Sequence, residues 1–217
     1  MNNLAEFESR LSAARRRRLR GLDSPCAIQA YLDNLPYVAE ERDRSPLAVM
    51  EDGQAHCLDG GIFAAVALRR LGHPAMILDL VPEPGKDDDH VLALYRHRGA
   101  WGALAKSNYV GLRFREPVYR SLRELAMSYF EWYTSFEKLK TLRGYTRPLD
   151  LARLDRWDWM WDEDGIRRIS RRLYRLKPVV LIEAGSAAVL SMPDERSYGA
   201  NTQGTDFDWV YGVRSNS

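Results

Sequence analysis

The sequence contains very little cysteine: Cys26 and Cys57 are the only two among 217 residues. Two thiols cannot build the disulfide framework that stabilises many small secreted domains. His56 stands next to Cys57, but no second pair has the spacing of a zinc ligand set, so no metal and no cofactor are expected. We therefore expect both thiols to be free in a reducing cytoplasm.

Long apolar runs and a strong net charge are also missing. No segment approaches the roughly 20 apolar residues of a membrane-spanning helix, so no membrane partner is expected. The first ten residues include acidic side chains and lack the apolar stretch of a secretory signal. The formal net charge of +2 does not by itself predict a nucleic-acid partner. Hydrophobic residues make up 45% of the chain, which is enough for one good core.

One basic run departs from this balance and comprises Arg15, Arg16, Arg17, Arg18 and Arg20. It is either a patch for nucleic acid or an acidic partner, or the solvated end of a helix, where the macrodipole favours cations. Acidic residues precede the run, a glycine follows it and no aromatic residue interrupts it. We favour the solvated helix end and do not expect nucleic-acid binding.

Periodicity and chain breakers predict a mixed α+β chain, without indicating its oligomeric state. Residues 36–53 are predicted to form a polar loop. Helices are expected over 4–20, 25–34, 57–71, 121–142 and 165–176, and strands over 75–81, 90–96, 100–105, 111–115 and 178–182.

Cys57 is the strongest candidate functional residue. It opens an amphipathic helix that ends in a Gly-x-Pro stop at Gly72. Unpaired N–H groups and partial positive charge at a helix N-terminus stabilise a thiolate, which predicts a lowered pKa for this thiol. Cys26 lies inside an ordinary amphipathic helix, and we interpret it as a small buried apolar residue.

A proton acceptor for this thiol follows downstream. His90 comes directly after the acidic loop at residues 87–89 and begins a strand-like alternation. A cysteine at a helix start followed by a histidine at a strand start is the order found in papain-like thiol enzymes. His73 lies in a Gly-His-Pro turn and His97 beside a hairpin turn, and both are expected on the surface. Cys57 and His90 are therefore the predicted catalytic pair.

Three segments downstream of Cys57 resemble the transglutaminase-like superfamily of papain-like cysteine enzymes: Leu68-Arg69-Arg70-Leu71-Gly72-His73-Pro74-Ala75, His90-Val91 and Gly99-Ala100-Trp101. The resemblance implies an α+β fold in which the Cys57 helix packs on a small antiparallel sheet. It also implies acyl chemistry on a peptide or protein substrate, with hydrolysis of a peptide or isopeptide bond, as in cytoplasmic bacterial members. Residues 1–144 would form this core with its N-terminal helices, and 145–217 a family-specific extension packed on it.

The resemblance also implies an Asp that orients the histidine, but the matching position holds Ala105. The length of the preceding hairpin turn decides which residue lies opposite His90. A four-residue turn places Ala105 there, a two-residue turn places Ser107 there, and a three-residue turn places Asn108 there. We favour Asn108, then Ser107, because an Asn carbonyl can orient an imidazole as in Cys-His-Asn triads.

The remaining site groups are less well defined. Candidate oxyanion donors are the backbone N–H of Cys57, the side chain of Gln54 and, more remotely, Tyr37. Asp59, near the helix start, is predicted to stabilise the helix rather than react. The missing Asp at Ala105 supports a second hypothesis, a non-catalytic binding or assembly module of the same fold.

Overall fold

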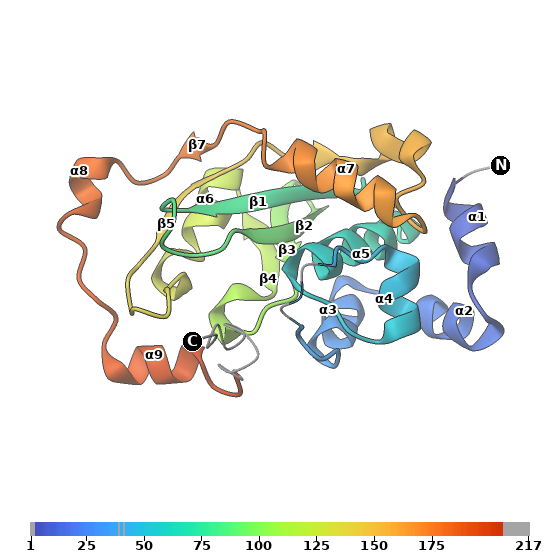
Figure 1. The fold of residues 1–217 in the computed structure, drawn as a ribbon, viewed down its shortest axis with the longest axis horizontal. Helices are drawn as coiled ribbons and strands as arrows, with labels where there is room; N and C mark the ends of the chain where they lie inside the picture. Colours follow the sequence, from blue (N-terminus) through green and yellow to red (C-terminus); the bar gives the residue numbers. More distant parts are fainter. Residues whose placement is uncertain (1–2, 39, 41, 206–217) are drawn as a thin grey trace, which may run out of the picture.

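The computed structural model describes residues 3–38, 40 and 42–205 of the chain. It confirms a mixed α+β architecture, with one antiparallel sheet and helices packed against it (Figure 1). The strand order is β4-β3-β2-β1-β5-β7, and β6 also pairs with β1. The strands are β1 (Met76–Pro82), β2 (His90–His97), β3 (Ala100–Leu104), β4 (Arg115–Tyr119), β5 (Leu142–Tyr145), β6 (Leu149–Asp150) and β7 (Val179–Val180).

The described helices are mostly short, and α5 is the longest of them. None of the described helices is long and apolar enough to cross a membrane. The α-helices are α1 (Asn3–Arg10), α2 (Ala13–Arg20), α3 (Pro25–Asp33), α4 (Pro46–Asp52), α5 (Cys57–Arg70), α6 (Leu122–Met127), α7 (Glu163–Leu173), α8 (Ala184–Ala187) and α9 (Glu195–Asn201). The 3-10 helices are η1 (Val110–Leu112), η2 (Phe130–Trp132) and η3 (Leu151–Trp157).

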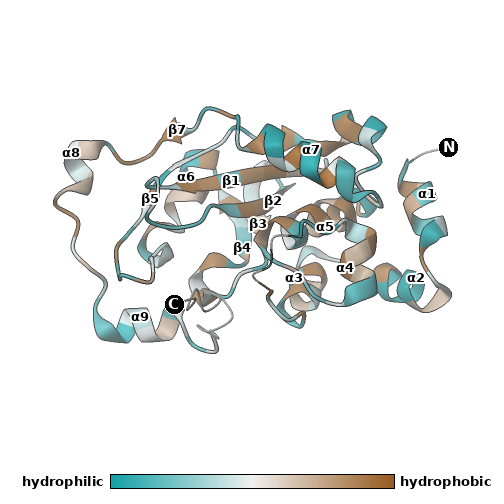
Figure 2. Ribbon diagram, viewed as in Figure 1, coloured by the Kyte–Doolittle hydropathy of each residue, from teal (hydrophilic) through white to brown (hydrophobic). Residues whose placement is uncertain are grey.

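Alternation along the central strands sends side chains into two separate cores. Ile77, Val91 and Ala93 are buried in the core that α5 covers, whereas Leu78 and Leu92 belong to the core on the opposite face of the sheet. Strands β1 and β2 are accordingly brown along most of their length in Figure 2. Both faces of the sheet are therefore covered, and α5 packs on one of them.

Two glycines let the start of α5 approach the sheet closely. A Cβ at Gly60 would lie 2.3 Å from the Cβ of Lys106, and one at Gly61 would lie 2.8 Å from Cγ1 of Val91. Both distances are too short for ordinary carbon–carbon contact. The small residues after Cys57 therefore set the distance between the helix and strand β2.

The hairpin of β2 and β3 closes with a two-residue turn at Arg98-Gly99, where φ is 49° and 86°. Positive φ at both central positions is the geometry that matches the twist of paired strands. The register pairs His97 with Ala100. Continued to the start of β2, this register places Ser107 opposite His90, the second of the three predicted alternatives.

The predicted helix over residues 4–20 is wrong in one respect, because it is two helices. Ser12 lies between α1 and α2, and its Oγ accepts a hydrogen bond from the backbone N–H of Arg15. A serine in this position caps a new helix rather than continuing the old one. The predicted helix over 25–34 is confirmed as α3, with Ser24 as its cap.

The predicted polar loop over residues 36–53 is also wrong, since it contains α4. Ser45 caps this helix, Pro46 is its first residue and Gly53 ends it with φ 68°. This is the same serine–proline start as in α3, which is a helix signal in spite of the polar composition.

The predicted helix over residues 121–142 extends only to Met127 as α6. The apolar residues after Met127 do not mark a helix face. Tyr129 and Tyr133 are buried against the sheet, in the core on the face opposite α5. Phe136, a member of the same predicted stripe, is instead exposed. The strand expected over 111–115 is wrong as well: residues 110–112 form η1, and β4 begins at Arg115.

The expected extension after residue 144 shares the sheet with the residues before it. The predicted boundary falls inside β5, and both β6 and β7 belong to the same sheet. Trp159, Ile166 and Ile169 are buried in the core that α5 covers. The division into a core and a family-specific extension stays a prediction, and its last residues, 206–217, lie outside the described residues.

We predict that Gly60→Ala destabilises the protein by about 1–3 kcal/mol, because the new methyl group collides with Lys106 close to its backbone. Urea unfolding measures the change. Gly199→Ala is the matched control, since this glycine also lies in a helix and has nothing near its Cβ position. The control should be neutral or stabilising by up to about 1 kcal/mol. Equal effects of the two changes would contradict the close approach.

Candidate active site

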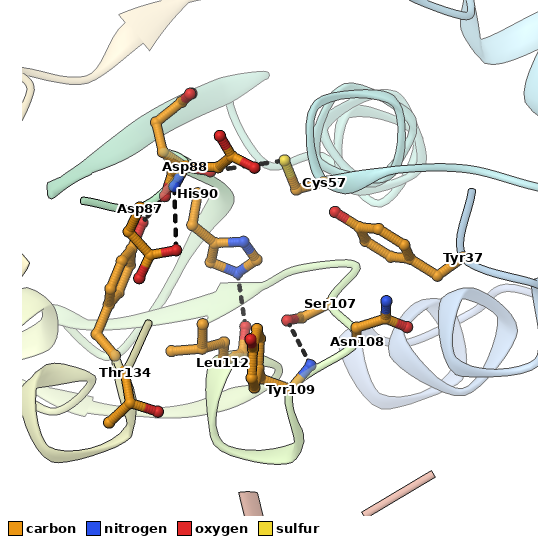
Figure 3. A pocket seen from close by; sticks show the side chains of 12 residues that line it. Tyr37, Cys57, Asp87, Asp88, His90, Ser107, Asn108, Tyr109, Leu112 and Thr134 are labelled. Carbon is orange, nitrogen blue, oxygen red and sulfur yellow. Dashed lines mark hydrogen bonds between the residues drawn. The ribbon is translucent and has the colours of Figure 1, made fainter. Parts of the chain in front are cut away.

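One pocket contains most of the residues predicted from the sequence. It lies where the N-terminus of α5 meets the start of β2 (Figure 3). Of the predicted site residues, only Gln54 is absent from its walls. The pocket is lined by Tyr37, Cys57, Asp87, Asp88, Asp89, His90, Ser107, Asn108, Tyr109, Leu112, Tyr133 and Thr134.

A capping box fixes the start of α5 and therefore the position of Cys57. His56 is the N-cap, and its Nδ1 accepts a hydrogen bond from the N–H of Leu58. Asp59 accepts in return from the backbone N–H of His56 and, at 2.7 Å, from that of Arg44. The buried Arg44 guanidinium also lies beside this carboxylate. The predicted structural role of Asp59 is confirmed, and His56 serves as a cap.

The Cys57 thiol lies against the backbone on both sides of His90. Its S–H donates to the carbonyl of Asp89 at an S···O distance of 3.8 Å. The backbone N–H of Val91 donates to the sulfur. The nucleophile candidate is thus held at the first residues of β2, beside the predicted histidine.

The expected lowering of the Cys57 pKa is not found. Burial raises the pKa of the thiol, and the acidic side chains of Asp89, Asp79 and Asp59 raise it further. These effects outweigh the stabilisation that a helix N-terminus gives to a thiolate. Cys57 is therefore a protonated thiol at neutral pH.

A buried carboxyl group and a half-buried one lie near the thiol. Asp79 on β1 is 2% exposed and forms a side-chain hydrogen bond with Asp89. Burial and the nearby Asp89 carboxylate raise the pKa of Asp79 to about 9, so Asp79 keeps its proton and donates to Asp89. At neutral pH the pair carries one proton and one negative charge close to the sulfur.

The His90 ring is held by a backbone carbonyl. Its Nε2 lies 2.7 Å from the oxygen of Leu112, and a carbonyl can only accept, so Nε2 carries the proton. The other ring nitrogen, Nδ1, faces the side of Cys57 and Tyr37 in Figure 3. Burial lowers the pKa of His90 to about 4, which keeps the ring neutral and leaves Nδ1 free to accept a proton. The ring of Tyr133 packs edge-on against it, with centroids 6.5 Å apart.

Ser107 and Asn108, the two candidates for orienting His90, line the same pocket. Ser107 Oγ accepts a hydrogen bond from the N–H of Tyr109. The backbone carbonyl of Asn108 accepts one from the hydroxyl of Thr205. The position of an orienting partner on Nε2 is taken by the Leu112 carbonyl, which no sequence signal could have indicated because every residue carries one.

The two side-chain oxyanion candidates lie in different surroundings. The amide of Gln54 donates to Glu40 in an exposed position, away from the pocket. Tyr37 lines the pocket, and its hydroxyl points toward Cys57 in Figure 3. Tyr37 was only the remoter candidate from the sequence, and it lies far before Cys57 along the chain.

The other sulfur and histidine residues lie outside this pocket. Cys26 is exposed, so its interpretation as a buried residue was wrong: α3 buries its other face, including Ile28 and Leu32. His97 is exposed as expected, whereas His73 is half-buried against the ring of Tyr95. Within the described ranges, no three His, Cys, Asp or Glu side chains are arranged to hold a metal ion.

The basic run is partly engaged in the fold. Nε of Arg15 donates to the carbonyl of Met50, and Nε of Arg16 donates to that of Glu8. The other arginines of the run lie on exposed positions of α2. Its interpretation as a solvated helix end stays a prediction.

Comparisons with known proteins give limited information on this chain. No protein-family model and no curated protein matches it. Two solved structures of LapG from Legionella pneumophila are similar in shape. One is 12% identical, with a TM-score of 0.37, and the match covers 51% of this chain and 73% of LapG. The other, EGTA-treated, is 11% identical, with a TM-score of 0.41 and coverage of 76% and 95%. At these scores the likeness assigns neither a family nor a function.

We predict that the His56 cap makes folding sensitive to acid. Burial lowers the pKa of His56 to about 4, from about 6.5 in the unfolded chain, so its stabilising contribution is complete above pH 6.5 and is lost as the pH falls toward 4. Asn also caps helices but does not titrate. Between pH 7.5 and 5, His56→Asn should therefore lose about 2 kcal/mol less unfolding free energy than the wild type.

Urea unfolding at the two pH values gives this difference. His97→Asn at the exposed end of β2 is the matched control, and it should behave like the wild type. An unchanged pH dependence in His56→Asn would show that His56 is not held neutral in the folded protein.

We also predict slow alkylation of Cys57 in the ligand-free protein. Because burial raises its pKa and only the thiolate reacts, Cys57 should react with iodoacetamide more slowly than exposed Cys26 at pH 7. Above pH 8 its rate should rise by about tenfold per pH unit. Mass spectrometry of the two cysteine peptides measures both rates. A faster reaction of Cys57 at pH 6.5 would instead show a preformed thiolate.

Proposed function

We propose that the protein is a cysteine-dependent acyl-transfer enzyme of papain-like, transglutaminase-like architecture, which hydrolyses peptide or isopeptide bonds. One observation carries this proposal. A thiol at the N-terminus of α5 lies beside a histidine whose Nε2 is held by a carbonyl and whose Nδ1 is left free on the thiol side. That is the arrangement of a nucleophile and an oriented general base.

The reaction begins from a neutral pair, since the thiol is protonated and the imidazole is uncharged. Nδ1 of His90 accepts the thiol proton while the sulfur of Cys57 forms a bond to the substrate carbonyl carbon. The electron pair of the C=O bond moves onto its oxygen, where the backbone N–H of Cys57 donates a hydrogen bond. The C–N bond then breaks, and the imidazolium gives its proton to the leaving amine.

The second half of the reaction releases the acyl group. His90 accepts a proton from water, the water oxygen attacks the thioester carbon, and the thiolate leaves and is reprotonated by His90. In the proposed mechanism the Leu112 carbonyl keeps the tautomer of His90 constant through both halves. Ser107 and Asn108 remain proposed site residues, because both line the pocket beside His90.

A non-catalytic binding or assembly module is the second candidate function. The raised pKa of Cys57 and the Ala105 in place of an orienting Asp favour it. In such a protein the pocket would hold a peptide segment without attacking it. The two candidates differ in whether Cys57 can be acylated with the help of His90.

We predict that p-nitrophenyl acetate acetylates Cys57 in preference to exposed Cys26 at about pH 7.5, because the oriented imidazole of His90 can accept the proton of Cys57. His90→Gln should slow the acetylation of Cys57 by about 100-fold or more, the usual contribution of a general base. Stopped-flow release of p-nitrophenolate and mass spectrometry of the cysteine peptides measure the two rates.

The reaction of Cys26 is the internal control, and it should be the same in both proteins. His73→Gln is a control variant for the Cys57 rate only, since His73 lies outside the Cys57 pocket but lines a second pocket with Cys26. Equal acetylation of Cys57 in wild type and His90→Gln would leave the binding module as the better explanation.

A further inference from the structure

We propose that Tyr37 is the second oxyanion donor of the site, with its phenolic O–H binding the substrate carbonyl oxygen while Cys57 attacks. This inference rests on the proposed function and assigns a further catalytic residue to it. It also supplies the donor that Gln54 was expected to provide, because Gln54 is held by Glu40 outside the pocket.

The backbone of Tyr37 is fixed to the segment that leads into α5. Tyr37 and Ala55 form a parallel β-bridge. The N–H of Ala55 donates to the carbonyl of Pro36, and the N–H of Val38 donates to the carbonyl of Ala55. The bridge therefore fixes the backbone of Tyr37 relative to the segment that leads into Cys57. Preorganised hydrogen-bond donors require such fixed positions.

The Tyr37 hydroxyl lies on the Cys57 side of the pocket. Both residues line the same pocket, and the hydroxyl points toward Cys57 in Figure 3. A substrate oxygen in the tetrahedral intermediate lies beside the attacking sulfur and the backbone N–H of the nucleophile. In the proposal, the Tyr37 O–H donates to that oxygen from this side of the pocket.

The protonation state of Tyr37 suits this role. Burial raises the pKa of the phenol well above its ordinary value, and the neighbouring Cys57 and Asp88 add to the shift. The hydroxyl therefore keeps its proton whenever the enzyme is folded and remains a donor. It donates a hydrogen bond without giving up the proton, which leaves the proton balance between Cys57 and His90 unchanged.

The other well-placed tyrosine of the pocket is engaged elsewhere. The hydroxyl of Tyr133 donates to the carbonyl of Asp88 at 2.6 Å and lies 3.3 Å from that of Leu80. Tyr133 therefore holds the acidic loop in place, and Tyr37 is the tyrosine whose O–H is directed at the nucleophile.

Two reactions of the same thiol separate this role from a general effect on Cys57. Acetylation by p-nitrophenyl acetate forms the S–C bond, places charge on the carbonyl oxygen and then breaks the bond to p-nitrophenolate. Alkylation by iodoacetamide displaces iodide directly and develops no oxyanion. In Tyr37→Phe, acetylation of Cys57 should fall by about 10²–10³-fold, while its alkylation at the same pH should change by less than about threefold.

Tyr31→Phe is the matched control, because Tyr31 packs on Phe63 of the same helix outside the pocket, and it should leave both rates unchanged. Circular dichroism verifies that the variants are folded. Unchanged acetylation in Tyr37→Phe overturns the proposal. Faster acetylation also overturns it, and would show that the hydroxyl obstructs the site. An equal fall in both reactions also overturns it. Failure of the proposed function appears differently, as a wild type whose Cys57 is not acetylated in preference to Cys26.

Discussion

The approach of the α5 N-terminus to the first residues of β2 is the constraint on which the candidate site depends. Gly60 and Gly61 have no side chains of their own, so Lys106 and Val91 pack directly against the helix backbone, and the Asp59 carboxylate fixes the first turn. Cys57 is the first residue of that turn, so its sulfur reaches the backbone on either side of His90.

The same close packing keeps both the Cys57 thiol and the His90 imidazole uncharged. Removing the thiol and the imidazole from water disfavours a charge on either one, and the Asp79–Asp89 pair adds one nearby negative charge. Both shifts therefore disfavour a thiolate–imidazolium pair. Binding of a substrate would change this balance by bringing a carbonyl group whose developing charge the site can stabilise.

Local signals in the sequence predicted the parts of the site that local chemistry determines. The Cys57 helix, the His90 strand and the hairpin turn each have a capping or turn signal of their own. The Ser45-Pro46 start of α4 was equally local, and the polar composition around it obscured it. The Leu112 carbonyl and the Tyr37 hydroxyl reach the site only through tertiary packing, so no spacing or residue type announces them. The apolar spacing of 121–142 predicted too long a helix for the same reason, because its later apolar residues are buried by packing on the sheet.

Because Ala105 replaces the orienting Asp, the proposed reaction depends more strongly on its oxyanion donors. An Asp in contact with the histidine stabilises the imidazolium that forms during the reaction, whereas the Leu112 carbonyl contributes only a dipole. Proton transfer from Cys57 to His90 is then costlier, and the difference has to be recovered where the negative charge develops, on the substrate oxygen. The phenol proposed here, Tyr37, and the N-terminal amide of α5 are suited to that task. In such a site the catalytic power depends more on binding the transition state than on the reactivity of the free thiol, and a protonated Cys57 in the empty pocket is compatible with an enzyme.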